Sequence, residues 1–317
     1  MILVAGIGSE RPLALVAEAL GASGADHRVL DQRRASAASL TLDIADADAG
    51  GAIRGTLLID GESIPLDAIR AIYLRLMDDA VLPDVARSPL DSTERIRSRR
   101  LHELLHCFAD IAPGRVLNRP SASASNHSKP FQAQAIRAAG FDIPETLITN
   151  NVAAAEEFIE RAWDEDGHVI YKSVSGIRSI VRRVGKQDLE RLDRIRWCPT
   201  QFQRFVAGTD IRVHVVGRSA LAAAIESEAT DYRYAARDIG VEPAIHACEL
   251  EPEVGARCVA LADRLDLPLA GIDLRRTPEG RHVCFEVNPS PAFSFYEERA
   301  KLPIADCIAR YLAGESD

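Results

Sequence analysis

The sequence GIDLRRTPEGRHVCFEVNPSP spans residues 271–291 and predicts a β-hairpin. An apolar run ends at Asp273, a turn containing proline and glycine follows, and a second strand ends with Glu286 and Asn288. We expect Asp273 to lie opposite the end of the second strand, where Glu286 and Asn288 share a face because they are two residues apart. Two carboxylates and an amide oxygen on rigid strands suit one or two Mg²⁺ ions with positions left for phosphate oxygens. The local pattern fits an ordinary hairpin with solvated acids equally well.

These residues also resemble a known family. Asp273 and the run Phe-Glu-Val-Asn-Pro at 285–289 are similar to the metal-binding end of the ATP-grasp ligases. In that family the acid, the glutamate and the asparagine hold the magnesium ions that bridge the phosphates of ATP. The resemblance implies that Asp273, Glu286 and Asn288 are metal ligands, and that ATP and Mg²⁺ (two ions) are the cofactors.

The composition is that of a soluble globular protein, with 47% apolar and 27% charged residues among 317. This length accommodates two or three domains, and the net charge of −9 argues against general nucleic-acid binding. The six cysteines form no C-x-x-C pair, which indicates reduced thiols. No signal peptide and no apolar stretch of membrane-spanning length is evident, so we expect a cytoplasmic protein with no nucleic-acid or membrane partner. The sequence leaves open whether the chain forms a homodimer.

Residues 1–115 are predicted to form an α/β domain. An apolar strand at 2–7, a helix at 12–20 and a strand at 24–30 make a βαβ unit. The turn after the first strand lacks the third glycine of a dinucleotide-binding fingerprint, so a structural domain is the favoured interpretation. A Pro-Gly pair places the domain boundary near 113–120.

A helix predicted over 91–110 contains a literal H-E-x-x-H motif, His102-Glu103 to His106. Positions i and i+4 share one face of a helix, so both imidazoles could bind one Zn²⁺ with Glu103 as general base. A zinc metallopeptidase is therefore an alternative from a different functional class. It requires a third protein ligand, and no further ligand pattern follows the motif in the sequence.

The resemblance to ATP-grasp ligases continues through roughly 116–312. Asn-Arg-Pro at 118–120 and Lys129 at a helix start are similar to the beginning of the grasp, and this match implies that Lys129 meets the α-phosphate. Lys172 lies near the end of a predicted strand, and the resemblance implies that it is the second lysine that contacts the nucleotide. The hairpin loop that follows can lay backbone N–H groups and hydroxyls over phosphates, and the basic cluster at 178–183 adds further positive charge. The loop residues expected at the nucleotide are Ser173, Ser175 and Gly176.

The predicted strand at 200–206 resembles the hinge of the family that holds adenine. The match implies that Gln203, Arg204 and Phe205 lie along the purine and offer backbone hydrogen bonds, and that Asp210 approaches the ribose. Arg212 lies on an alternating strand among apolar residues, where an arginine needs an anion as partner. By resemblance, Arg212 and Lys172 act on the transferring phosphoryl group.

The expected fold is α/β (α+β): an N-terminal α/β pre-grasp domain (1–115) precedes two α+β subdomains that clasp the nucleotide. These are a small or central subdomain (116–206) and a C-terminal subdomain with the metal site (207–317). An acid-aromatic-arginine step at 231–233 looks similar to the microviridin-type (graspetide) peptide macrocyclases and, more broadly, to the ribosomal-protein glutamate ligases. Candidate substrate-binding residues are Arg75, Arg233 and Ser290.

The resemblance implies a ligase that converts a carboxylate into an acyl phosphate with release of ADP. An amine, or in macrocyclases a hydroxyl, then attacks the acyl phosphate, so no side-chain nucleophile is required. The expected substrates are a small-molecule or peptide carboxylate and an amine or hydroxyl acceptor, in a modification or biosynthetic pathway. Two alternatives stay open at this point: the zinc peptidase and a nucleotide-binding module without catalytic activity.

Overall fold

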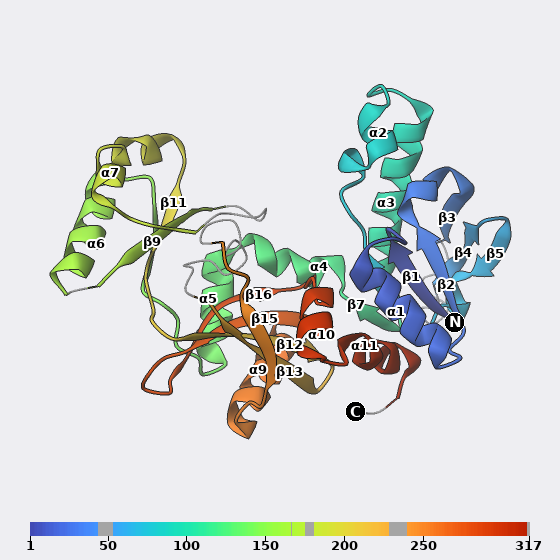
Figure 1. Ribbon diagram of the computed structural model, residues 1–317. Helices are drawn as coiled ribbons and strands as arrows, with labels where there is room; N and C mark the ends of the chain where they lie inside the picture. Colours follow the sequence, from blue (N-terminus) through green and yellow to red (C-terminus); the bar gives the residue numbers. More distant parts are fainter. Residues whose placement is uncertain (44–52, 166, 175–180, 228–239, 316–317) are drawn as a thin grey trace.

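A computed structural model describes residues 1–43, 53–165, 167–174, 181–227 and 240–315. The described elements form two lobes that rise on either side of a central sheet (Figure 1). The predicted fold class, a mixed α/β chain with several sheets, is confirmed. None of the helices in the described ranges combines the length and the apolar character needed to cross a bilayer.

The N-terminal lobe contains the parallel sheet that the βαβ pattern predicts. The strand order is β2-β1-β6-β7, and all neighbouring strands are parallel. Its elements are β1 (Ile2–Gly6), α1 (Arg11–Ala22), β2 (His27–Asp31), β6 (Ala71–Arg75) and β7 (Arg115–Leu117). The second strand begins three residues later than expected, at His27, because the chain first makes a turn at Gly24, whose φ is 72°.

A second, antiparallel sheet and a helical arm complete this lobe. Its elements are η1 (Gln32–Ala37), β3 (Ala38–Asp43), β4 (Arg54–Ile59), β5 (Glu62–Pro65), η2 (Leu66–Ala68), η3 (Asp79–Val81), α2 (Pro83–Arg87) and α3 (Thr93–Ile111). The helix predicted over 91–110 is α3. The hydroxyl of Ser92 accepts a hydrogen bond from the backbone N–H of Arg95, which caps the helix. Leu101, Leu105 and Phe108 bury one face of α3 against the parallel sheet.

The opposite lobe is an antiparallel sheet in the order β10-β9-β11-β8. Its elements are β8 (Thr146–Thr149), α6 (Val152–Asp164), β9 (Val169–Ser173), β10 (Arg182–Arg183), α7 (Lys186–Leu189), η5 (Leu192–Trp197) and β11 (Thr200–Arg204). Helix α6 covers one face of this sheet, where Phe158 and Ile159 pack with Val169 and Phe202. The other face is therefore available to line a site.

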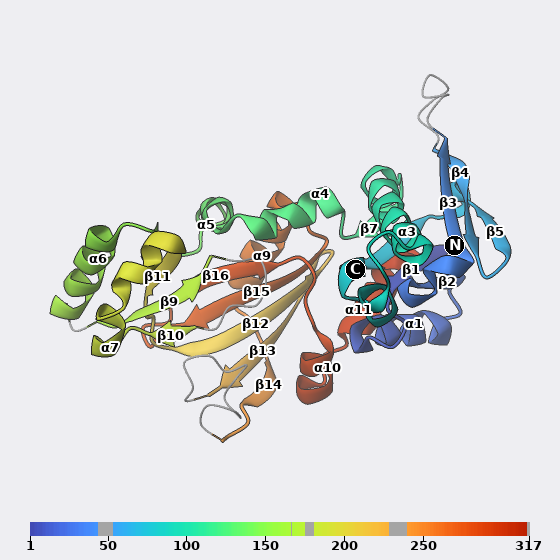
Figure 2. The ribbon, with the colours of Figure 1, turned by 90° about the horizontal axis from the view of Figure 1, so that it is seen from above.

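The central sheet has five antiparallel strands in the order β14-β13-β12-β15-β16. Its strands are β12 (Thr209–Val216), β13 (Ser219–Glu226), β14 (Ala244–Cys248), β15 (Leu269–Arg276) and β16 (His282–Asn288). The helical segments α4 (Pro120–Ser123), η4 (Ala124–His127) and α5 (Lys129–Ala138) lead towards it, and α5 and α9 (Pro252–Arg264) run along one side of it (Figure 2). The predicted hairpin is β15–β16, and it is confirmed.

The last two helices are α10 (Ser294–Ala300) and α11 (Ile304–Ala313). Ile304 and Ile308 of α11 share a core with Val4, Leu13 and Tyr73 of the N-terminal lobe. The parallel sheet is therefore covered by α3 on one side and by α1 with α11 on the other. The end of the chain thus completes the core of its beginning, while domain boundaries near 115 and 206 stay a prediction.

Candidate nucleotide and metal site

The three predicted metal ligands lie together at one end of the β15–β16 hairpin. Asp273 is the direct cross-strand partner of Glu286, and Asn288 pairs with Gly271 two residues away. The alternate residues Ile272 and Val287 point into the core under α9, which leaves the oxygen-bearing side chains on the open face of the sheet. The arrangement expected from the hairpin pattern is confirmed.

Two buried amides hold the backbone of this hairpin in place. The amide nitrogen of Asn118 donates to the carbonyls of Leu269 and Pro289, both at 2.6 Å, and its oxygen accepts from the Leu269 N–H at 3.0 Å. The amide of Gln132 donates to the Val287 carbonyl at 2.7 Å and accepts from the Val287 N–H at 3.3 Å. Gln132 was not singled out in the sequence, where its only signal is a polar residue one turn after Lys129.

Both predicted nucleotide lysines converge on Glu286. The Lys129 ammonium lies 2.6 Å from one carboxylate oxygen of Glu286, and the Lys172 ammonium lies 3.9 Å from the other. Burial raises the pKa of Glu286, but attraction by Lys129 and Lys172 outweighs burial and holds that pKa below its usual range. Because Lys172 comes from β9 and Glu286 from β16, this contact also shows that the uncovered face of the β9 sheet faces the central sheet.

Arg212 of β12 lies on the same open face and contacts Asp273 at 2.5 Å. Its side chain is 8% exposed, and its guanidinium carbon lies 5.8 Å from the centre of the Tyr296 ring. The guanidinium passes directly over Gly271, where a Cβ atom would come within 2.3 Å of the Arg212 Nη2 atom. Glycine at 271 therefore leaves the room in which Arg212 reaches Asp273.

His214 lies beside Arg212 on the buried part of this face. It is fully buried, and within the described ranges neither ring nitrogen has a hydrogen-bond partner. Burial lowers the pKa of His214 well below its ordinary value, and the nearby charge of Arg212 adds to this effect. The ring packs against Tyr296 with centroids 5.0 Å apart, so His214 is part of the buried packing beside Arg212.

The hinge residues divide between the two faces of β11. The Gln203 amide donates to the Thr146 hydroxyl at 2.9 Å on the uncovered face. Arg204 follows the alternation of Phe202 and points to the α6 side, where it forms ion pairs with Glu165 and Glu145. The backbone N–H of Arg204 donates to the Glu145 carbonyl at 2.9 Å. Strand alternation therefore turns the Arg204 side chain away from the cleft face, and a backbone contact of these residues with a purine stays a prediction.

Asp210, expected near the ribose, is engaged by an arginine that sequence reasoning missed. Arg275 donates from Nε and Nη2 to the two carboxylate oxygens of Asp210 at 2.8 and 2.9 Å, and from Nη1 to the Val206 carbonyl at 2.7 Å. Asp210 and Arg275 are direct cross-strand partners of β12 and β15. Only the strand register could have revealed this pair, because 65 residues separate the two in the sequence.

The predicted substrate residues Arg75 and Ser290 lie in contact. Arg75 donates to the Ser290 hydroxyl and to the Pro291 carbonyl, both at 3.0 Å, and pairs with Glu10 through its other nitrogens. These contacts connect the N-terminal sheet to the loop that follows the β15–β16 hairpin. Ser173 ends β9 as an exposed residue, and Ser175, Gly176 and Arg233 lie outside the described residues.

The H-E-x-x-H residues do not form a metal centre with the neighbours that the structure describes. His102 and His106 pack edge to face with centroids 4.4 Å apart, and Glu103 lies 3.6 Å from Arg99. Burial lowers the pKa of both histidines. In the described part of the chain no third His, Cys, Asp or Glu joins them in a group that could hold a metal, so the zinc peptidase lacks a ligand.

Comparison with protein families gives a match to the RimK-like ATP-grasp domain over residues 125–312. A probable alpha-L-glutamate ligase of Mannheimia succiniciproducens is 26% identical over 218 residues, which cover 66% of this chain and 70% of the relative. The solved ATP-grasp ligase PsnB, in complex with its minimal precursor, Mg and ADP, is 30% identical. It aligns with a TM-score of 0.76 over 99% of this chain and 96% of its own.

A second solved structure supports the same fold. It is the RiPP-associated ATP-grasp ligase of Chryseobacterium gregarium, in complex with ADP and a leader and core peptide. It is 22% identical and aligns with a TM-score of 0.83, over 100% of this chain and 97% of its own.

Proposed function

Because this chain belongs to the RimK-like ATP-grasp family, we propose that the face shared by β9, β12, β15 and β16 binds ATP and Mg²⁺ and activates a carboxylate as an acyl phosphate. The observation that carries this proposal is the meeting of Lys129 and Lys172, from separate elements, on Glu286 beside Asp273. The oxygen donors at the end of the hairpin fit magnesium, which prefers carboxylate and carbonyl oxygens. Magnesium bound there would neutralise phosphate oxygens and polarise the group to be transferred.

The charges around Glu286 are arranged for a polyphosphate. Glu286 forms ion pairs with both lysines, and its single negative charge leaves net positive charge there. We infer that Lys129 and Lys172 bind phosphate oxygens of the nucleotide. Arg212 is held by Asp273 and spreads charge on the phosphoryl group in transfer. A substrate carboxylate oxygen attacks the γ-phosphorus and ADP leaves. An amine or hydroxyl then attacks the acyl carbon, and inorganic phosphate departs with the bridging oxygen.

We propose that the carboxylate belongs to a peptide. The support is the similarity to PsnB, which has been solved with its precursor, and an apolar groove on the α6 side of the β9 sheet, the face opposite to Lys172. The groove has a volume of about 240 Å³, an apolar floor that includes Leu192, Ile195 and Phe202, and arginines at 182, 191 and 194. The neighbouring Trp197 is 90% exposed, and tryptophan is enriched among the residues that contribute most to binding at interfaces.

Peptide binding can be followed at the groove itself. The chain contains two tryptophans, so a Trp163→Phe variant leaves Trp197 as the single fluorophore beside the groove. Titration with an acidic peptide should change its emission, and Arg194→Glu should weaken the binding of that peptide. Unchanged emission together with catalytic turnover of the same peptide would place the peptide elsewhere.

The nucleotide site is tested by calorimetric titration with ADP, with and without Mg²⁺. Wild type should bind, Lys172→Ala should bind more weakly, and Glu286→Ala should lose the dependence on Mg²⁺. Lys186→Ala is the matched control, because Lys186 is exposed at the start of α7. Absence of binding by the wild type would refute the proposal, whereas binding without ADP release from ATP in the presence of acceptor peptides would favour the non-catalytic module.

We also propose a cytoplasmic location. The six cysteines are free thiols, which supports this location.

A further inference from the structure

Arg183 lies on the cleft face of the β9 sheet, and its neighbour Arg182 lies on the opposite face. Arg183 is the cross-strand partner of Ile170, and Arg182 is the partner of Tyr171. Cross-strand partners share a face of a sheet, and Ile170 shares its face with Lys172 because they are two residues apart. Since Lys172 reaches Glu286 on the central sheet, the face that carries Arg183 is the face towards the proposed nucleotide site.

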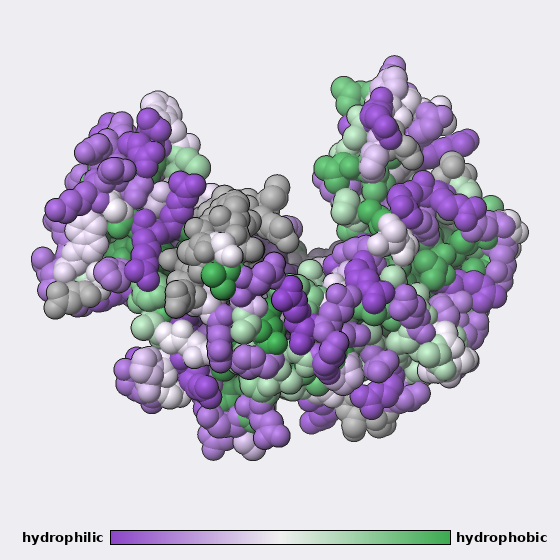
Figure 3. Space-filling model, viewed as in Figure 1, coloured by the Kyte–Doolittle hydropathy of each residue, from purple (hydrophilic) through white to green (hydrophobic). Residues whose placement is uncertain are grey.

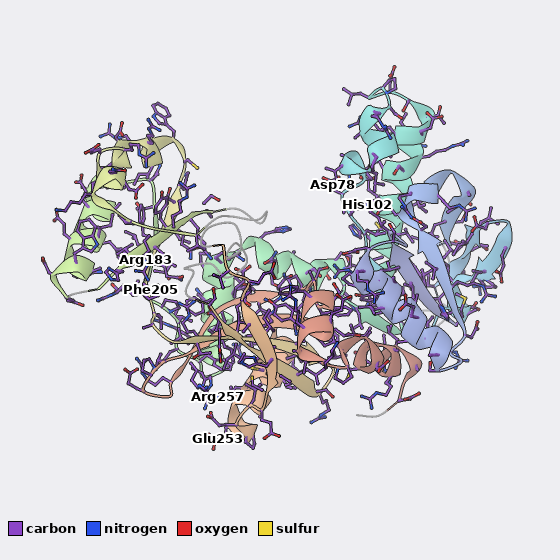
Figure 4. The ribbon with its side chains drawn as sticks, in the orientation of Figure 1. Asp78, His102, Arg183, Phe205, Glu253 and Arg257 are labelled. Atoms are coloured by element: carbon purple, nitrogen blue, oxygen red, sulfur yellow. The ribbon has the colours of Figure 1, made fainter. Side chains whose placement is uncertain are left out.

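The guanidinium of Arg183 is held against the hinge. Its central carbon lies 4.5 Å from the centre of the Phe205 ring, and Figure 4 shows the two side chains together at the base of their lobe. Phe205 follows β11 and leads into β12, so it lies where the chain crosses from one sheet to the other. Arg275 also lies near this ring, at 5.4 Å, but Asp210 neutralises it.

Arg183 differs from Arg275 in its ion pairing with the residues that the structure describes. No carboxylate within the described ranges forms an ion pair with Arg183, and its side chain is exposed. An exposed guanidinium that is ordered by an aromatic ring and lacks an anionic partner is well suited to stack on a further planar group. Such a surface favours a flat, electron-rich ligand over a purely ionic one.

The position along β9 indicates which part of a nucleotide this ligand is. Ile170 precedes Lys172 by two residues, which corresponds to about 7 Å along a strand. If Lys172 meets the phosphates, Arg183 therefore lies on the far side of the ribose, next to the hinge. We propose that Arg183 binds the purine base of ATP by stacking its guanidinium on the ring beside Phe205, an assignment that rests on the proposed function. The basic cluster at 178–183 was expected to serve the phosphates, and this geometry gives Arg183 a different ligand.

The proposal is tested by calorimetry with two probes, Mg·ADP and Mg·inorganic triphosphate, on three proteins. Arg183→Ala should weaken ADP binding by roughly tenfold, the loss typical of one stacked base, and should leave triphosphate binding within twofold of wild type. Lys186→Ala, which removes an exposed charge at the start of α7, should bind both probes as wild type does. Arg183→Lys should not restore ADP affinity, because an ammonium keeps the charge without the planar stacking surface.

Two results would overturn the assignment. Equal loss of ADP and triphosphate binding in Arg183→Ala would mean that Arg183 contacts phosphate. Unchanged ADP binding would mean that it does not contact the nucleotide. Failure of the wild type to bind ADP would instead refute the proposed function, so the two failures are distinguishable. Thermal melting of Arg183→Ala should match the wild type, because the side chain is exposed and forms no ion pair with the described residues.

Discussion

The replacement Gly271→Ala tests whether the position of Arg212 governs phosphoryl transfer. A Cβ atom at 271 would lie 2.3 Å from Nη2 of Arg212 and 2.8 Å from Cβ of Pro291, whereas ordinary contact begins at 3.4 Å. The difference, 3.4 − 2.3 = 1.1 Å, is the displacement that the guanidinium must accept. Because Arg212 is 8% exposed and bound to Asp273, it cannot swing into solvent without breaking that contact. A misplacement of about 1 Å at a reacting centre can reduce a rate by up to about 10²-fold.

The assay separates the rate from nucleotide binding. We expect the rate of ADP release from ATP to fall by roughly 10- to 100-fold. The affinity for Mg·ADP should stay within threefold, because Arg212 acts on the γ-phosphoryl group, which ADP lacks. The clash with Pro291 should also cost about 1–3 kcal/mol of unfolding free energy. Gly255→Ala is the control, because Gly255 lies within α9 and no atom lies within 4 Å of its added Cβ. A normal rate of ADP release in Gly271→Ala would refute the role that we give Arg212.

Three further outcomes follow from the same contacts. Asn118→Ala should lower the unfolding free energy measured by urea denaturation by roughly 2–4 kcal/mol, because it leaves three buried backbone groups without their partner. Asn150→Ala, at an exposed position, should not lower it, and equal stabilities of the two variants would contradict this reasoning. Glu286→Gln should abolish Mg²⁺-dependent ADP binding, which calorimetry measures. Wild type should lose unfolding free energy as the pH falls through the lowered pKa of Glu286, and an acid titration should show that Glu286→Gln lacks this loss. Wild type should lose unfolding free energy as the pH falls below about 6.5, because His214 binds a proton in the unfolded state more readily than in the folded state, where burial lowers its pKa. His214→Phe should flatten this slope between pH 7.5 and 5.5.

The two lobes face each other across the central sheet, and the contacts between elements explain how one site can join them. The space-filling view shows a hollow between the lobes (Figure 3). Lys172 from one lobe and Arg75 from the other both reach residues of the β16 end, at Glu286 and Ser290. We therefore expect ligands at Glu286 to affect the orientation of both lobes.

Local chemistry in the sequence predicted the β15–β16 hairpin and the helix that contains the H-E-x-x-H motif. Two apolar runs around a proline-glycine turn predict the hairpin from neighbouring residues alone. Its exact register was not predicted, because an irregularity between Asp273 and Leu274 sets Asp273 opposite Glu286. The motif at 102–106 shows the limit of such reasoning. Its residues lie on a helix as expected, but a metal needs a third ligand that only the fold can supply.

Tertiary structure decided every contact between residues distant in the sequence. Asn118 lies 151 residues before Leu269, and Arg75 lies 215 residues before Ser290, so no local pattern could pair them. The register of β12 and β15 places Asp210 opposite Arg275. Strand alternation directs the Arg204 side chain to the α6 side and the Gln203 side chain to the cleft face. The sequence by itself determined which residue types could bind ATP and magnesium. The packing of two sheets determined which of them meet, because partners are chosen by position in space and not by separation along the chain.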